Sequence, residues 1–223
     1  GNGKNKNRPQ PIDTTTHWKI ASSSSAYQSG HTLAIKDNGT LWAWGQNNDG
    51  QLGNGTTYSN KLLPTQITND SNWFSISNGF FFSVATKTDG TLWTWGRNGR
   101  GQLGIGSSTF KKTIPTKIGN DSTWSAVSAG SEFVIALKNN GTLWAWGYNY
   151  NGQLGNGNTT TQHTPIQIGL DSTWVFISAG NKHSFGIKSD STLWSWGSNQ
   201  HGQLGRGGNS RIPIQVGTDK WKA

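Results

Sequence analysis

The stretch Gly99–Gly104 reads GRGQLG and matches the G-x-G-x-x-G pattern of loops that hold the phosphates of a dinucleotide. In such a site the loop opens a helix whose N-terminus faces the pyrophosphate. Here the loop is followed by Ile105, Gly106 and two serines, and then by another strand-like segment. The three related stretches elsewhere in the chain lack the first glycine. We therefore expect no nucleotide and no other cofactor at this loop.

Histidines and carboxylates are few and form no recognisable catalytic or metal-binding motif. The chain has 5 His, 10 Asp and Glu, and no Cys, so disulfides and thiolate zinc sites are excluded. It contains neither an HExxH zinc helix nor a GxSxG nucleophile elbow. Asp70, Asp121 and Asp171 recur three residues before a tryptophan, which is typical of turn residues. The sequence predicts no catalytic residue, no metal site and no enzymatic activity. The histidines are His17, His31, His163, His183 and His201.

The positive charge of the chain is spread rather than concentrated. The net charge is +9, and residues 1–8 form a basic polar leader with Lys4, Lys6 and Arg8. Other lysines recur once per repeat at the end of a strand-like segment; they are Lys36, Lys87, Lys138 and Lys188. A nucleic-acid-binding protein concentrates its charge in a stripe or patch. We expect the charge to keep a low-charge surface soluble, and a nucleic-acid partner is disfavoured.

Tryptophan marks an internal repeat. The second tryptophan of a W-x-W pair falls at 44, 95, 146 and 196, in steps of 51, 51 and 50 residues. A proline followed by a lone tryptophan eight or nine residues later occurs five times, with the tryptophans at 18, 73, 124, 174 and 221. These positions account for all 13 tryptophans, so none is left for a separate function. The spacing indicates repeats of about 50 residues.

Each repeat divides into four short strand-like segments. The first follows the lone tryptophan, as in Trp73–Gly79, and the second alternates apolar and other residues, as in His31–Lys36. An Asn-Gly or Asp-Gly turn, replaced by Asp-Ser in the fourth repeat, leads to the tryptophan pair. A Gly-rich loop then leads to a proline-bearing segment such as Leu63–Ile67, which should be the edge strand.

Four-stranded sheets that recur at this period are typical of β-propeller blades. We predict an all-β fold with four antiparallel blades at about 18–67, 73–118, 124–168 and 174–216, within one domain of residues 9–221. Each tryptophan pair shares one face of its strand and should fill the gap between neighbouring sheets. These structural tryptophans are Trp42, Trp44, Trp93, Trp95, Trp144, Trp146, Trp194 and Trp196.

The motifs resemble those of the regulator of chromosome condensation repeat family. That family has an Ala-Gly-x-x-His element, a Gly-x-aromatic-x-Trp-Gly strand and a Gly-Gln-Leu-Gly loop. Here they stand as SAGNKH at Ser178–His183, GTLWAWG at Gly39–Gly45, and GQLG four times. Phe82 and Phe133 replace the family's histidine, whereas His31 and His183 retain it and should be structural. The resemblance implies a propeller that typically closes with seven blades.

Four repeats leave the closure of the ring open. The chain is either a segment of a longer propeller, a small four-bladed ring, or an assembly partner of other copies. Residues 217–223 begin a further half unit. A proline-bearing strand lies near each end, and the surplus one could pair with a neighbouring copy as a homo-oligomer or filament. These assembly strands contain Pro9, Pro11 and Ile12 at one end and Ile212, Pro213, Ile214 and Val216 at the other.

Functional variety should lie where the repeats differ. Asn and Gln recur in the loop after each tryptophan pair and should brace it, whereas the residues between them vary. Tyr and Arg among these varying residues are favoured in protein interfaces. The candidate binding residues, expected together on one rim, are Asn48, Asp49, Arg97, Arg100, Tyr148, Tyr150, Gln200 and His201.

We therefore predict a non-enzymatic propeller module that binds a protein partner or other copies of itself. One alternative is a structural subunit that self-assembles through its open end blades. Another, implied by the resemblance, is a guanine-nucleotide exchange factor or a chromatin-binding propeller. The Cys-free, Asn-, Thr-, Ser- and Gly-rich composition favours a bacterial extracellular or cell-surface protein that is mature after signal removal. No apolar run is long enough for a membrane span.

Overall fold

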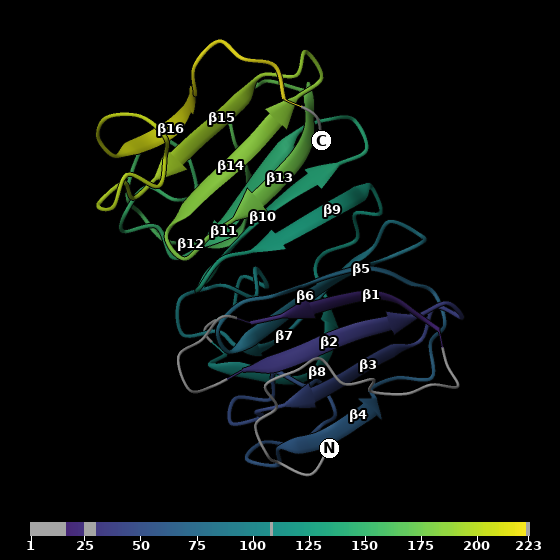
Figure 1. The fold of residues 1–223 in the computed structure, drawn as a ribbon. Helices are drawn as coiled ribbons and strands as arrows, with labels where there is room; N and C mark the ends of the chain where they lie inside the picture. Colours follow the sequence, from purple (N-terminus) through teal and green to yellow (C-terminus); the bar gives the residue numbers. More distant parts are fainter. Residues whose placement is uncertain (1–16, 25–29, 108, 222–223) are drawn as a thin grey trace, which may run out of the picture.

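The computed structural model describes residues 17–24, 30–107 and 109–221, which form sixteen strands in four sheets. Each sheet is a meander of four antiparallel strands and corresponds to one sequence repeat (Figure 1). The first is β1 (Trp18–Ser23), β2 (His31–Lys36), β3 (Leu41–Gly45) and β4 (Lys61–Gln66). The second is β5 (Trp73–Asn78), β6 (Phe82–Lys87), β7 (Leu92–Arg97) and β8 (Lys111–Lys117). The third is β9 (Trp124–Ala129), β10 (Phe133–Lys138), β11 (Leu143–Gly147) and β12 (Gln162–Gln167). The fourth is β13 (Trp174–Ala179), β14 (His183–Lys188), β15 (Leu193–Gly197) and β16 (Ser210–Gln215).

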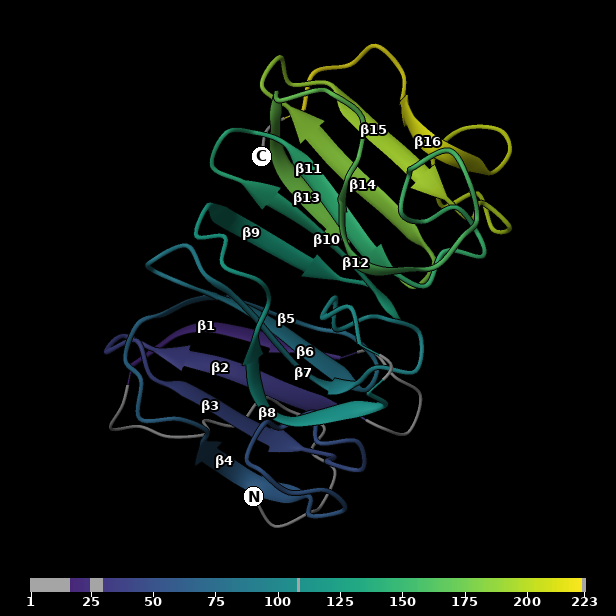
Figure 2. The same ribbon diagram turned by 180° about the vertical axis from the view of Figure 1, so that it is seen from behind.

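The four sheets are the blades of a propeller, and we number them 1 to 4 in chain order. The prediction of an all-β propeller with four-stranded antiparallel blades is confirmed. Blades 1 and 4 lie at opposite ends of the series in both views of the ribbon (Figures 1 and 2).

Tight hairpins join the second and third strands of every blade. Gly39 has a φ of +77°, as the left-handed position of a two-residue turn requires. A Cβ at Gly39 would also lie 2.0 Å from the main-chain oxygen of Ser71, because the hairpin rests on the next blade. In blade 4 the same position is Ser191, which adopts a φ of +68°. Its carbonyl accepts a hydrogen bond from the Trp221 N–H at 2.7 Å, the bond that Gly39 accepts from Trp73 at 3.1 Å.

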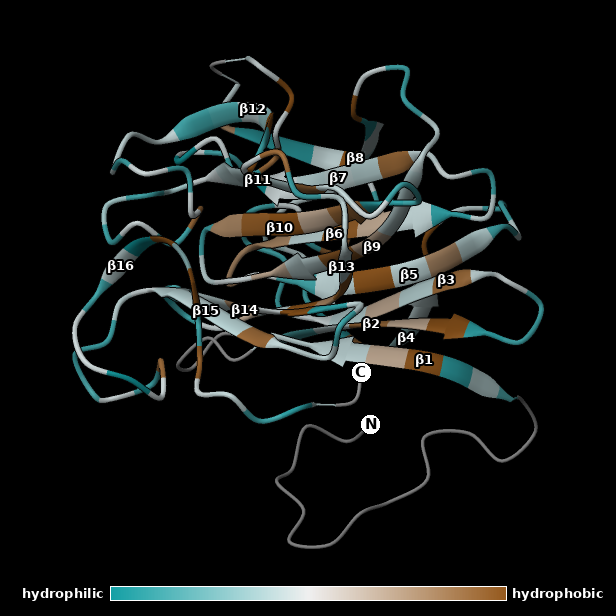
Figure 3. Cartoon of the chain, turned by 90° about the horizontal axis from the view of Figure 1, so that it is seen from above, coloured by the Kyte–Doolittle hydropathy of each residue, from teal (hydrophilic) through white to brown (hydrophobic). Residues whose placement is uncertain are grey.

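The core lies between the blades. An aliphatic face of blade 1, including Leu33 and Ile35, packs against Trp73, Ile76 and Trp95 of blade 2. The same arrangement joins blade 2 to blade 3 and blade 3 to blade 4. Hydrophobic colour accordingly marks the inner strands, whereas the outer strands β12 and β16 are largely hydrophilic (Figure 3). Among the described residues, no such cluster joins blade 4 to blade 1.

Main-chain hydrogen bonds tie each blade to the next at the level of the loops. The loop after the third strand reaches the fourth strand of the next blade: Gly55 donates to Thr113, and Gly106 donates to His163, at 2.8 and 2.9 Å. The loops between first and second strands are also linked, since Ser131 accepts from Phe80 at 3.0 Å. The blades are therefore held by backbone contacts as well as by their core.

Candidate functional site: a protein-interaction rim

The repeated amide side chains brace the loops after the tryptophan pairs, as predicted. In blade 2, Asn98 accepts a hydrogen bond from the Leu103 N–H at 3.1 Å, and Gln102 accepts one from the Arg100 N–H at 2.8 Å. The other three blades repeat both bonds. These amides hold the loops in shape and leave the residues between them to present side chains to solvent.

The G-x-G-x-x-G stretch has a packing role. No helix follows it in the part of the chain that the structure describes, so the loop has no helix N-terminus beside it to face a pyrophosphate. Gly104 instead lies against the next blade, where a Cβ would be 2.7 Å from Nε1 of Trp146. Glycine is needed here because it lets the loop approach the indole.

Four of the candidate rim residues, on blades 2 and 3, make two sets of contacts that both start from the loop of residues 97–100. The guanidinium of Arg100 lies 5.2 Å from the centre of the Tyr148 ring, across the blade boundary. Tyr148 stacks on Tyr150, with ring centres 6.4 Å apart and planes at 13°. Arg97 lies 5.4 Å from the Phe110 ring centre and also faces the ring of Phe81 at 5.6 Å. We define the rim patch as Phe81, Arg97, Arg100, Phe110, Tyr148 and Tyr150.

The rim patch is accessible and carries positive charge. Tyr150 is 71% exposed and Phe110 is 53% exposed. Among the described residues, neither Arg97 nor Arg100 forms an ion pair with a carboxylate. Phe81 and Phe110 were not singled out from the sequence. The residues next to them in the chain vary between repeats, and this variation could have identified Phe81 and Phe110 as candidates.

The other four candidates occupy the equivalent loops of blades 1 and 4. Asn48 and Asp49 are partly exposed on blade 1, and Gln200 and His201 are exposed on blade 4. In the described ranges no aromatic stacking, cation–π contact or ion pair connects them to the rim patch. Whether they take part in binding stays a prediction.

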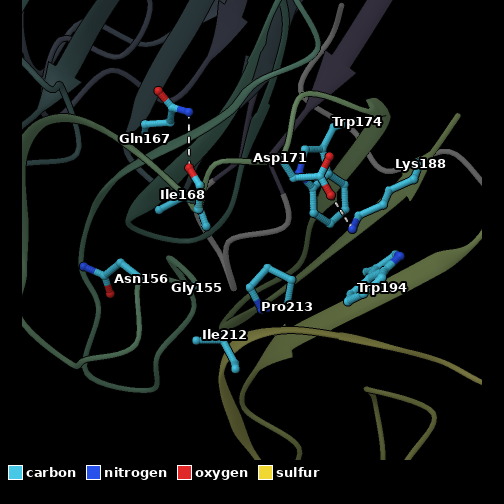
Figure 4. Close-up of a pocket in the computed structure, with 11 residues that line it drawn as sticks. Gly155, Asn156, Gln167, Ile168, Asp171, Trp174, Lys188, Trp194, Ile212 and Pro213 are labelled. Atoms are coloured by element: carbon cyan, nitrogen blue, oxygen red, sulfur yellow. Dashed lines mark hydrogen bonds and ion pairs between the residues drawn. The ribbon is translucent and has the colours of Figure 1, made fainter.

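In blades 2, 3 and 4 the recurring lysine lies in a cage formed by two tryptophans and an aspartate. This cage was not predicted from the sequence. In blade 4, the Lys188 ammonium lies 3.7 Å from the centre of the Trp194 ring and 4.9 Å from that of Trp174. It also forms an ion pair with Asp171 (Figure 4). The hydrogen bond from Lys188, followed by that from Thr173, lowers the pKa of Asp171 to about 2. The same cage is built around Lys87 and Lys138.

His31 is a buried structural residue. Its Nε2 lies 2.9 Å from the hydroxyl of Ser83 in the next blade, and that hydroxyl donates to the carbonyl of Gln51 at 2.8 Å. Nε2 therefore carries the proton, and Nδ1 is buried with no hydrogen-bond partner among the described residues. Burial lowers the pKa of His31 to about 3, so the ring is neutral at physiological pH. His183 is only partly buried.

The predicted assembly strands lie at the two ends of the chain. Pro9, Pro11 and Ile12 fall outside the described residues. Ile212, Pro213 and Ile214 lie in β16, which pairs with β15, and Val216 follows directly. Among the described strands β15 is the sole neighbour of β16.

The described residues contain no group of three or more His, Cys, Asp or Glu that could hold a metal ion. The same part of the chain has no helix long and apolar enough to cross a membrane.

The repeat, the blade topology and the loop motifs agree with a known domain. The model of the RCC1-like domain matches residues 1–222. This chain belongs to the RCC1-like domain family.

Several known proteins are similar in sequence to part of this chain. The human probable E3 ubiquitin-protein ligase HERC6 is 34% identical over 128 residues, which are 56% of this chain and 12% of that protein. The human Regulator of chromosome condensation is 33% identical over 130 residues, covering 56% of this chain and 31% of that protein. The chain therefore spans a third or less of the length of these relatives.

Solved structures show the same fold. Prp20p from Saccharomyces cerevisiae superposes with a TM-score of 0.80 over 93% of this chain and 52% of that chain, at 19% sequence identity. At this identity the match concerns the fold alone.

Proposed function

We propose that this chain is a non-enzymatic module that binds a protein partner through the rim patch. The observation that carries this proposal is the contact of Arg100 with Tyr148 across the boundary of blades 2 and 3. It joins two loops that differ from their counterparts in the other blades into one exposed surface. The fold supports the general assignment, because RCC1-like propellers serve as binding modules for proteins.

The composition of the rim patch suits a protein interface. Tyr, Phe and Arg are enriched in such interfaces, and Tyr and Arg are frequent among their energetic hot spots. The stacked tyrosines also form a pre-organised surface that loses little conformational entropy on binding. Proteins of similar fold have protein partners: yeast RCC1 is seen bound to Kap60, and Prp20p binds Gsp1p and histones.

Site-specific crosslinking tests the proposal and needs no assumption about the identity of the partner. A photo-crosslinking amino acid at Tyr150 should capture a discrete protein in cells that produce the chain. The same group at Leu170, which is 96% exposed in the turn between β12 and β13, serves as the control position. Adding Arg97→Ala and Arg100→Ala should abolish the crosslink at position 150. If the products from positions 150 and 170 are the same, the rim patch is not the binding surface.

Guanine-nucleotide exchange is a second candidate, favoured by the 33% identity with the Regulator of chromosome condensation. The proposal predicts faster release of fluorescent GDP from a small GTPase in the presence of the chain. A panel of GTPases with no acceleration would exclude it. Chromatin binding predicts DNA affinity that falls steeply with salt concentration.

Self-assembly is a third candidate, favoured by two incompletely covered blade faces. On blade 4, Phe185 and Leu193 are partly exposed, whereas their blade 3 equivalents Ile135 and Leu143 are 0% exposed. On blade 1, Trp44 is partly exposed. These two faces have the chemistry that packs together at the internal blade boundaries. We infer that blade 4 of one copy could receive blade 1 of another, with β16 also available for strand pairing.

Light scattering on the purified chain tests self-assembly. The mass should rise with concentration, and Phe185→Glu or Trp44→Glu alone should reduce it. A mixture of these two variants should form heterodimers, because one intact boundary remains between them. A concentration-independent monomer would exclude the candidate. An extracellular or cell-surface location remains a proposal from composition, and fractionation of producing cells would test it.

A further inference from the structure

Each blade has two edges that carry different connections. The loop between the first and second strands and the loop between the third and fourth strands emerge at the same edge of an antiparallel blade. In blade 2 they are joined by a hydrogen bond from the Arg97 N–H to Phe81 at 2.9 Å. Bonds between blades, such as that from Phe80 to Ser131, place these edges on one side of the molecule. We call this side the loop face, and the opposite side, which carries the hairpins between second and third strands, the hairpin face.

The two faces differ in charge. Among the described residues, the loop face has two carboxylates, Asp49 and Glu132, and eight basic residues. The hairpin face has the other seven carboxylates and seven lysines. The three ion pairs of the described ranges all lie on the hairpin face. The excess of positive charge therefore lies on the loop face. Its basic residues are Lys61, Arg97, Arg100, Lys111, Lys112, Lys182, Arg206 and Arg211.

Arg211, near the start of β16, extends the rim patch onto blade 4. Its stem packs against the loop of blade 3, because a Cβ at Gly152 would lie 2.8 Å from Cγ of Arg211. A groove of about 570 Å³ lies here between blades 3 and 4. It shares Tyr150 with the rim patch, so the two form one continuous surface. The residues that line the groove are Tyr150, Asn151, Thr159, Asn209 and Arg211.

The groove has the chemistry of a carboxylate site. Every side chain that lines it has a hydrogen-bond donor, and none is acidic. Arg211 is exposed and forms no ion pair within the described part of the chain. A carboxylate only accepts hydrogen bonds, and a guanidinium can hold it through two of them. The groove therefore suits the side chain of an aspartate or glutamate.

The aromatic rings of the rim patch favour a polypeptide over a nucleic acid. Single-stranded nucleic acids bind by stacking their bases on aromatic side chains. Here two phenylalanines already contact Arg97, and Tyr148 contacts both Arg100 and Tyr150. The rings thus hold the two arginines in place. Arginines held in this way lose less conformational freedom when they pair with carboxylates.

We propose that the loop face binds an acidic segment of the partner protein, rich in Asp and Glu. This inference rests on the proposed function and specifies the chemistry of the partner. One carboxylate occupies the groove at Arg211, and others pair with Arg100 and Arg97. The lysines of the loop face attract the segment at longer range, so the affinity falls as the salt concentration rises.

A fluorescent peptide of alternating Glu and Ser tests the proposal on the purified chain, with a peptide of alternating Gln and Ser as the neutral control. Fluorescence anisotropy at low salt should detect binding of the Glu peptide alone. Arg100→Glu with Arg211→Glu should weaken this binding by more than about tenfold, because two charge-assisted pairs are replaced by repulsion.

The matched control changes the net charge equally on the hairpin face. Lys19→Glu with Lys117→Glu should weaken binding by less than about twofold. All four substituted side chains are exposed, and unchanged thermal unfolding will show that both double variants are folded. Equal weakening by the two double variants would overturn the proposal, as would failure of the Glu peptide to bind. Tighter binding of DNA with the same number of charges would assign the loop face to nucleic acid instead.

The crosslinking experiment at position 150 separates this inference from the proposed function. Mass spectrometry of the captured protein should place the crosslink in a segment rich in Asp and Glu. A crosslink to a neutral or basic segment would overturn the inference and leave the proposed function in place. If no protein is captured, the proposed function fails, and the peptide titration still decides whether the loop face binds an acidic chain.

Discussion

The indole of Trp146 donates a hydrogen bond at 3.0 Å to the main-chain oxygen of Gln102 in the preceding blade. Trp95 makes the same bond to Gln51 at 2.9 Å. Each ring therefore fixes the loop of one blade to the core of the next, in addition to filling the space between their sheets. At these two boundaries the second tryptophan of the pair links neighbouring blades.

Substitution of a tryptophan that links two blades should destabilise the folded state. Trp146 is fully buried, so Trp146→Ala should lower the free energy of unfolding by about 3–5 kcal/mol. Trp221, which is 44% exposed, is the matched control, and Trp221→Ala should change it by less than about 1 kcal/mol. Chemical denaturation of both variants checks the difference. Equal losses would contradict the role assigned to Trp146.

The close approach of loop and ring predicts a contrast between two glycines. Gly104 and Gly208 have φ values of +66° and +69°, but a Cβ has no atom within 4 Å at Gly208. Gly208→Ala should therefore cost only the backbone strain, about 1–2 kcal/mol. Gly104→Ala should cost more, because the new methyl group meets Trp146. Melting temperatures of the two variants provide the measurement, and a larger loss at Gly208 would refute the packing argument.

Burial of His31 predicts a pH dependence of stability. The unfolded chain binds a proton at this residue below pH 6.5, whereas the folded chain does so only near its pKa of about 3. The unfolded state thus binds more protons in this window, and stability falls as the pH is lowered through it, by up to about 1.4 kcal/mol per pH unit.

The variant His31→Phe isolates this contribution, because phenylalanine already occupies the position in blades 2 and 3. Urea denaturation between pH 7 and pH 4 should show a shallower pH dependence for the variant. Parallel curves for both proteins would show that His31 does not contribute.

The cage in blade 4 predicts a second, more acidic transition. The pKa of Asp171 is lowered to about 2, chiefly by the hydrogen bond from Lys188. A carboxylate of this kind stabilises the folded state above its unfolded pKa, and the contribution is lost as the pH falls from about 4 towards 2. Asp171→Asn should lower stability at pH 7 and flatten this acidic part of the profile. The pKa of Asp190 is also lowered, by hydrogen bonds from Thr192, but its carboxylate forms no ion pair among the described residues. Asp190→Asn therefore serves as the comparison that separates the ion pair of Asp171 from the hydrogen bonds of its turn.

The blades could be predicted from sequence because their signals are local. The tryptophan spacing and the turn glycines each depend on one strand and its immediate neighbour. The cage around Lys138 could not, because Asp121 and Trp144 come from different segments that meet only after the sheet twists. Each of these three residues was recognisable as a repeated position, but the residues that it contacts could not be identified from the sequence.

The rim patch could be predicted only in part. Repeat comparison identified Arg100 and Tyr148 as varying residues on a common rim. It could not show that the side chain of one loop lies over the ring of the other, since that depends on the offset between two blades. Phe110, which follows the loop by several residues, was missed for the same reason.

The backbone bonds from Gly55, Gly106 and Gly157 to the next blade bear on how this surface can diversify. They anchor the far end of each loop, while the repeated amides anchor its near end. Residues between the two anchors can be exchanged without disturbing the framework. Grafting a new set of loop tips should therefore redirect recognition and leave the architecture intact.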